Sequence, residues 1–209
     1  MKKNQEQFLQ RTRLALTNAL TTPELLSALE QYTYNAKKLR EGLALYDRVE
    51  DLTRQRERAQ AAQYQATDLL NQAKKELLYI FRIHVDTARL AYRREAQYQD
   101  TLGLTGTTPR ETVACLAHIK RFYAHVPAPM MTKYHVPPKE LTQATQLVAR
   151  VEELLALQRK SMSQPQQISD IRLRTLTELQ TWMRRFEKIS EVALDDQPQQ
   201  REALGQTVR

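Results

Sequence analysis

Apolar residues recur every three and four positions across residues 38–99, a stretch with no proline and a single glycine. One seam of positions keeps its register through the run, and its members are Leu45, Val49, Leu52, Arg56, Ala59, Gln63, Ala66, Leu70, Ala73, Leu77, Ile80, His84, Thr87 and Ala91. A sustained spacing of this kind is typical of a helix that packs along another helix. The pattern therefore predicts a long helix that begins near Lys37 and ends at the Leu102-Gly103 pair.

This long helix is expected to be continuous. Residues 54–67 contain no Gly, Pro, Asn or Asp that would form a turn, and their glutamines and alanines are compatible with helix. A helix of about 60 residues would be roughly 90 Å long. The alternative is a helical hairpin that turns near residues 60–65, where the seam is least apolar. We favour the continuous helix.

Shorter helices are predicted on both sides of the long one. Thr22 and Pro23 form a helix start signal, and Thr108 with Pro109 forms another. Pro165 interrupts the last helical pattern and should kink or break it. The predicted helices other than the long one cover residues 8–20, 23–32, 111–125, 130–134 and 139–194.

The second half of the chain repeats the first at a distance of 102 residues. Without a gap from Tyr32 to Gly103, Leu39 falls on Leu141 and the Leu102-Gly103 pair falls on Leu204-Gly205. The recurrence indicates an internal duplication, with repeats at residues 8–104 and 115–206. The second repeat carries the same hairpin alternative, with its turn near residues 162–167.

Four segments of the first copy resemble uncharacterised bacterial tandem-repeat helical proteins, which carry no assigned activity. The segments are Tyr32, Lys38-Leu39-Arg40-Glu41-Gly42, Val49-Glu50-Asp51-Leu52 and Leu102-Gly103. The resemblance covers nearly the whole chain and implies an all-helical fold, with no activity to carry over. The second copy departs from the pattern at Ala144, which stands where the first copy has Gly42.

Taken together, these patterns predict one all-α domain over residues 1–209. Its expected form is an elongated antiparallel bundle or coiled coil of two long helices with added short helices. No run of apolar residues is long enough to cross a membrane. The single cysteine excludes an internal disulfide and a zinc framework, so a cytoplasmic setting is expected.

The net charge of +8 raises the question of nucleic-acid binding. Residues 1–108 hold 17 Lys and Arg against 13 Asp and Glu, and the remainder holds 15 against 11, so the excess is evenly spread. An even spread is typical of solvated helix faces. The densest clusters, which would contact a polyanion, are Arg54, Arg56, Arg58, Arg93, Arg94, Arg184 and Arg185.

Candidate chemistry is sparse. Cys115, His118 and His125 share one predicted helix face, but packing explains them better than a metal site because Cys115 and His125 would be about 15 Å apart. His84 lies in the seam and is expected to be a buried histidine with a hydrogen-bond partner. Glu76 and Glu178 recur in both copies, without the Glu-x-x-His motif of di-metal bundles.

No catalytic, cofactor or metal residue is assigned, and we expect a protein that is not an enzyme. The favoured function is a helical interaction or scaffold protein that binds another helical protein or its own copy. Polyanion binding through the arginines is one alternative, and a metal or small-ligand site within the bundle is another. The sequence indicates neither the partner nor the oligomeric state.

Overall fold

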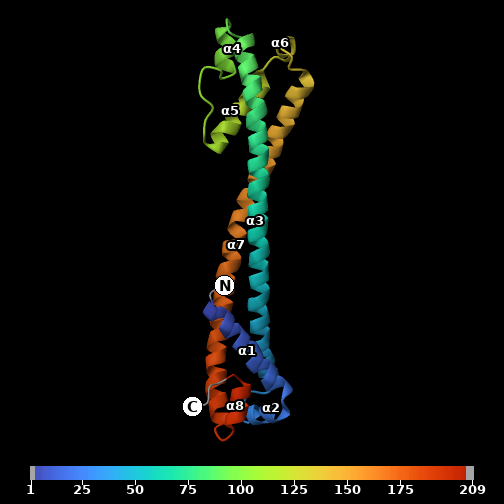
Figure 1. Cartoon of the computed structure of the whole chain (residues 1–209). Helices are drawn as coiled ribbons and strands as arrows, with labels where there is room; N and C mark the ends of the chain where they lie inside the picture. The colour runs from blue at the N-terminus through green and yellow to red at the C-terminus, as the bar shows by residue number, and fades with distance from the viewer. Residues whose placement is uncertain (1–2, 206–209) are drawn as a thin grey trace. The chain divides into compact units, whose positions relative to one another are not determined.

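The computed structural model describes residues 3–205, which form eight α-helices and no strand (Figure 1). The last residue of the second predicted repeat, Gln206, lies outside this range. The helices are α1 (Lys3–Thr21), α2 (Pro23–Glu30), α3 (Ala36–Ala91), α4 (Ala96–Thr101), α5 (Thr112–His125), α6 (Ala128–Lys133), α7 (Pro138–Ala193) and α8 (Pro198–Ala203). The all-α prediction is confirmed, with α3 and α7 packed antiparallel as the two long helices.

Both long helices are continuous, so neither hairpin alternative holds. Each is 56 residues long, and helix runs through residues 60–65 and 162–167. The expectation that Pro165 breaks the second long helix is wrong. Its ring removes one N–H from the helical ladder, but packing of an apolar face supplies most of the stability of a helix in a protein. Leu176 and Leu179 on α7 are buried beyond this point.

The first long helix ends eleven residues earlier than the sequence indicated, at Ala91 rather than at Leu102-Gly103. The side-chain amide of Gln99 donates to the carbonyls of Tyr92 and Arg93 just past the helix end, and the Tyr92 carbonyl also accepts from the amide of Glu95. The buried Tyr92 ring packs against Tyr98 with their centroids 4.6 Å apart. These contacts replace the glycine or proline that normally marks a helix end.

The start of α5 also differs from the prediction of Thr108 as cap with Pro109 behind it. Helix begins at Thr112, and the Glu111 carboxylate accepts hydrogen bonds from the amides of Val113 and Ala114. Those bonds hold the pKa of Glu111 below its ordinary value. A carboxylate at this position satisfies the free amides and complements the helix dipole, which the threonine hydroxyl at residue 108 does not do here.

The described chain divides into two compact units. Unit 1 consists of residues 3–60 and 164–205, which carry α1, α2, the first part of α3, the last part of α7 and α8. An aromatic cluster lies in its core, where Trp182 stacks on Phe186 and meets Tyr34 edge-on, both at 5.5 Å. Trp182 lies directly on Gly42, where an added Cβ would be 2.7 Å from the indole. Because the indole leaves no room for a side chain, residue 42 is glycine in the first copy, where the second copy has Ala144.

Unit 2 consists of residues 61–163, which carry the last part of α3, α4, α5, α6 and the first part of α7. Phe81 on α3 meets Phe122 on α5 edge-on, with centroids 5.3 Å apart. Val148, Val151 and Leu154 bring α7 into the same buried cluster. The core therefore joins α3, α5 and α7.

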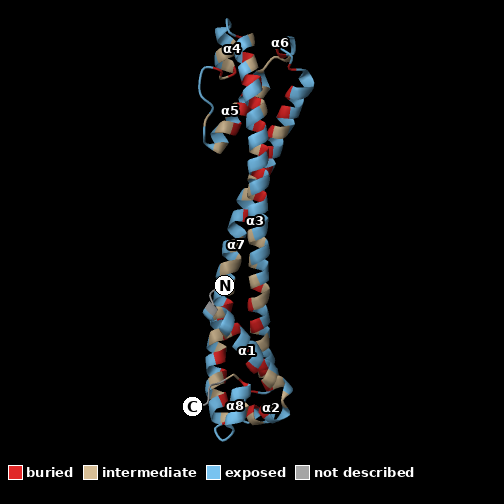
Figure 2. Cartoon of the chain, viewed as in Figure 1, coloured by how far each residue is buried: buried red, intermediate tan, exposed pale blue. Residues whose placement is uncertain are grey.

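The predicted seam faces inward along both long helices (Figure 2). Every one of its positions in α3 is buried or half-buried, and so is every position 102 residues later in α7. The polar centre of the seam is less buried than its ends. No residue of α3 between Leu52 and Ala66 is fully buried. There Arg172 donates to the Thr53 hydroxyl at 2.7 Å within unit 1.

The spacing of 102 residues recurs in the backbone. Helix α7 begins and ends 102 residues after α3, and α8 does the same relative to α4. The left-handed residues recur as well, since Thr33 is followed by His135 and Gly103 by Gly205. Thr33 and His135 each end a short helix with the paired 6→1 and 5→2 hydrogen bonds of a Schellman motif.

Candidate functional site

The predicted arginine clusters are divided between the two units. In unit 1, Arg54, Arg56 and Arg58 lie near the level where Arg172 of α7 meets Thr53 of α3. Arg184 and Arg185 lie twelve residues further along α7, which is about 18 Å along its axis. Arg93 and Arg94 belong to unit 2. Six of the seven side chains are exposed and Arg56 is half-buried.

The predicted cysteine–histidine face of α5 does not assemble a metal site. Across residues 3–205, no group of three or more His, Cys, Asp or Glu side chains is placed to hold a metal ion. His118 packs edge-on against Phe81, and burial lowers its pKa, with Arg121 and Arg89 acting in the same direction. His125 donates through Nδ1 to the Arg121 carbonyl at 2.8 Å. These contacts are those of packing and helix-end residues.

His84 is buried in unit 2, as expected, and its partner is Tyr123 of α5. Its side chain is 2% exposed, and its Nδ1 lies 3.0 Å from the Tyr123 hydroxyl. Burial raises the pKa of Tyr123, so the hydrogen bond joins a protonated phenol to the imidazole. The Glu140 carboxylate lies 3.8 Å from Nε2, which is too long for a hydrogen bond.

The charge of His84 is controlled by two opposing effects. Burial lowers its pKa, and the nearby Glu140 carboxylate partly offsets that effect. Sequence reasoning missed Tyr123 and Glu140 because they lie on two other helices, 39 and 56 residues away. Only the packing of α5 and α7 against α3 brings them to the imidazole.

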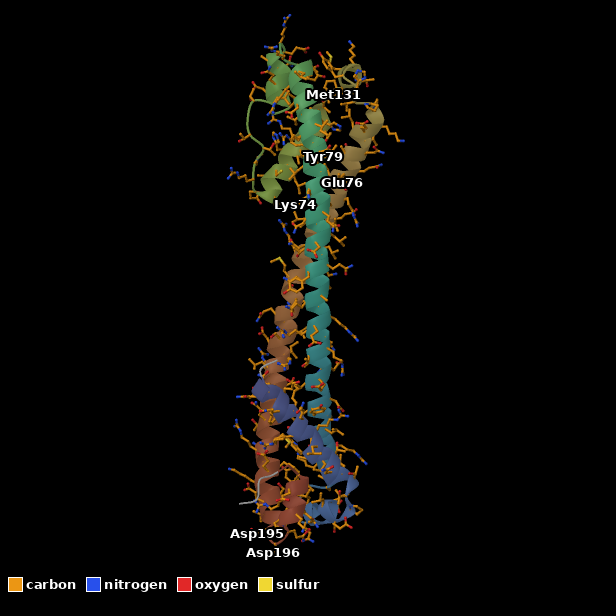
Figure 3. The ribbon with its side chains drawn as sticks, in the orientation of Figure 1. Lys74, Glu76, Tyr79, Met131, Asp195 and Asp196 are labelled. Carbon is orange, nitrogen blue, oxygen red and sulfur yellow. The ribbon has the colours of Figure 1, made fainter. Side chains whose placement is uncertain are left out.

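Glu76 and Glu178, which recur in both copies, are exposed side chains in different units. Each lies on the outward side of its helix, and Figure 3 labels Glu76 beside Tyr79 on α3.

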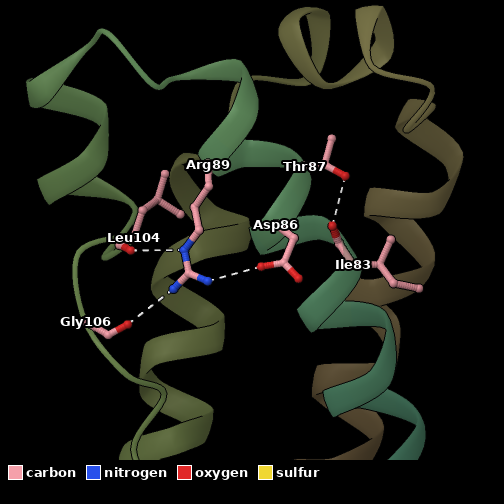
Figure 4. A network of polar contacts seen from close by, with 6 residues as sticks. All are labelled: Ile83, Asp86, Thr87, Arg89, Leu104 and Gly106. Atoms are coloured by element: carbon pink, nitrogen blue, oxygen red, sulfur yellow. Dashed lines mark hydrogen bonds and ion pairs between the residues drawn. The ribbon is translucent and has the colours of Figure 1, made fainter.

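A loop closes over α3 in unit 2, and Arg89 holds it there (Figure 4). The guanidinium donates to the carbonyls of Leu104 at 3.2 Å and Gly106 at 3.3 Å, and it pairs with Asp86 at 3.1 Å. This loop leads to Glu111, the cap of α5. Together α3, the loop and α5 line a half-open pocket of about 320 Å³. The pocket was not predicted, since its walls come from three separate segments.

The comparisons with family models, with curated proteins and with solved structures find no match to this chain. Within residues 3–205, no helix combines the length and the apolar character that crossing a membrane requires.

Proposed function

We propose that this chain is a non-catalytic helical interaction protein that binds an amphipathic helix of a partner along α3. The observation that carries the proposal is an apolar stripe on the outer side of α3 in unit 2. The stripe consists of Leu69, Tyr79, Ile83 and Leu90. Tyr79 and Leu90 are 69% and 66% exposed, well above what the edge of a packed core requires.

The spacing of the stripe matches a helical partner. Leu69, Ile83 and Leu90 are separated by multiples of seven residues, and Tyr79 lies four before Ile83. A second helix lying along α3 would meet side chains at this interval. Glu76 occupies the one vacant seven-residue step, so the stripe is interrupted by a single charge.

The charges beside the stripe indicate what the partner helix carries. Lys75 and Arg82 are exposed on α3, and Arg93 and Arg94 follow its end. The exposed acids of the same stretch are Asp68 and Glu76, with Glu95 after Arg94, whereas Asp86 is already paired with Arg89. A partner helix with acidic residues along its apolar face would complement this surface.

The test is capture of partners from an extract of the source cells with full-length protein. The variant Ile83→Glu/Leu90→Glu should lose the partner, whereas Leu173→Glu, a similarly exposed leucine on α7, should retain it. Nuclease and moderate salt should change little. Capture that survives the stripe variant contradicts the proposal.

Polyanion binding gives the opposite pattern in the same experiment. A nucleic-acid complex loses affinity steeply between low and moderate salt, and it would disappear with nuclease. It would also weaken in Arg93→Gln/Arg94→Gln while surviving the stripe variant. Sedimentation of the purified protein shows whether the captured helix belongs to a second copy.

We also infer that the chain arose by duplication of one helical unit. The identical lengths of α3 and α7 and the recurrence of left-handed residues at a spacing of 102 support this. An experimental structure in which residues 32–103 do not superpose on residues 134–205 would contradict it. The free thiol of Cys115 is compatible with the reducing cytoplasm that we propose as its location.

A further inference from the structure

The pocket between α3, the 104–111 loop and α5 has an apolar floor. Leu77 and Leu78 of α3 and Leu116 and Ile119 of α5 line it. Its volume of about 320 Å³ is at the lower end of the range of small-molecule sites. Because Arg89 fixes the loop at two carbonyls, the pocket is formed before any ligand enters.

Two cations line the same pocket, and no carboxylate does. Lys74 donates to the Thr112 hydroxyl at 2.9 Å, which uses one of its three N–H groups, and Arg110 is exposed on the loop. The nearby acid Glu111 accepts hydrogen bonds from the amides of Val113 and Ala114, and its charge is also within electrostatic reach of Lys74. Neither cation forms an ion pair with a carboxylate in the described part of the chain.

We propose that this pocket binds a small amphipathic carboxylate, with its hydrocarbon tail on the leucine floor and its carboxylate at Lys74 and Arg110. Burial of the tail supplies affinity in proportion to the apolar area removed from water. The two cations supply the charge-assisted hydrogen bonds that select an anion over a neutral molecule of the same shape. The volume favours a medium-length chain over a long one.

This site is independent of the helix-binding stripe. The stripe residues Leu69, Tyr79, Ile83 and Leu90 are not among those that line the pocket. The ligand site and the proposed function can therefore fail separately.

Cys115 makes the proposal measurable, since it lines the pocket and is the single cysteine of the chain. Burial raises the pKa of its thiol, so alkylation is slow and sensitive to what covers it. With the full-length protein, saturating decanoate should slow alkylation of Cys115 at least tenfold. Decanol, which lacks the charge, and acetate, which lacks the tail, should have much smaller effects.

The matched variants are Lys74→Met and Lys75→Met, which each remove one charge from neighbouring positions of α3. Lys75 is exposed and does not line the pocket. Lys74→Met should weaken decanoate binding about tenfold by calorimetry and leave decanol unchanged, whereas Lys75→Met should bind decanoate like the parent. Unchanged circular dichroism establishes that both variants fold.

Three results would overturn the proposal. Decanoate fails to protect Cys115 at millimolar concentration, decanol protects it equally well, or the two lysine variants bind alike. Failure to protect Cys115 would mean that decanoate does not bind the pocket in solution. Equal protection by decanol, or equal binding by the two lysine variants, would mean that the pocket does not recognise the carboxylate.

Discussion

The two units place different residues at the same step of their long helices. In unit 2, α3 carries His84, and in unit 1, 102 residues later, α7 carries Phe186. Both side chains are buried. His84 meets the Tyr123 hydroxyl, whereas Phe186 meets the rings of Trp182 and Tyr34. The same step of the backbone thus holds an imidazole with a hydrogen-bond partner in unit 2 and a phenyl ring among aromatic neighbours in unit 1.

The two units also differ in their histidine content. The four histidines at positions 84, 118, 125 and 135 all belong to unit 2, and unit 1 has none. The single tryptophan, Trp182, belongs to unit 1, and the single cysteine, Cys115, belongs to unit 2. Each unit therefore carries its own chemical reporter.

The largest effect is expected when the aromatic cluster of unit 1 is opened. Phe186→Ala removes a ring that is fully buried between Trp182 and Tyr34, and it should cost about 4 kcal/mol of unfolding free energy through lost burial and a cavity. Urea unfolding followed by Trp182 fluorescence measures this cost. The loss should be equal at about pH 7.5 and pH 5.5. A cost below about 1 kcal/mol would mean that the site collapses around the missing ring.

Proline in the long helices provides the next comparison. Pro165 of α7 corresponds to Gln63 of α3, which has the backbone N–H that proline lacks. Gln63→Pro should cost about 3 kcal/mol, because a proline inside a helix removes a hydrogen bond and clashes with the preceding turn. Pro165→Gln should stabilise the protein by up to a similar amount. Thermal unfolding by circular dichroism checks both changes, and a stabilising Gln63→Pro would refute the continuity of α3.

Alanine substitutions at the two left-handed glycines distinguish the cost of backbone strain from the cost of a packing clash. Gly103 and Gly205 have φ values of +66° and +71°, so alanine should cost about 1 kcal/mol at either. At Gly103 the new Cβ would also lie 2.7 Å from Cε1 of His118, whereas at Gly205 the nearest atom is 4.0 Å away. Gly103→Ala should therefore cost about 1 kcal/mol more than Gly205→Ala in urea unfolding. Equal costs would show that His118 moves aside freely.

The sequence predicts the long helices well because their seam is a repeated local signal. Every seam position is buried or half-buried, including the polar ones such as Arg56 and Gln63. The end of α3 and the start of α5 were missed because side chains of Gln99 and Glu111 cap them, and neither residue type is a strong boundary marker.

The candidate sites could be predicted only in part. That His84 is buried follows from its place in the seam, but its partner Tyr123 follows from the packing of α5, which no periodicity encodes. The pocket depends on a loop tied down by Arg89, and such side-chain to carbonyl bonds leave no pattern in the sequence. The exposed stripe was not predicted either, because apolar residues of α3 outside the seam can be exposed, as Tyr79 is, or buried, as Phe81 is, and only the packing of the other helices decides which.

The most direct test of the difference between the units is their response to acid. The pKa of His84 in the folded protein lies below its ordinary value of about 6.5, so the unfolded chain binds the proton more readily. The stability that neutral His84 provides is complete above about pH 6.5 and is lost as the pH falls toward the lowered pKa. One proton gives a slope of at most about 1.4 kcal/mol per pH unit. His118, whose pKa is also lowered, acts in the same direction.

Hydrogen exchange resolves the two units in one experiment, with protection factors corrected for the intrinsic rate at each pH. Between about pH 7.5 and pH 5.5, protection of residues 80–88 on α3 should fall, while that of residues 182–190 on α7 should stay within twofold. In His84→Phe/Tyr123→Phe, most of the fall should disappear. An equal fall in both segments, or none in residues 80–88, would contradict the claim that the two units share a backbone plan but differ in a buried, titratable core.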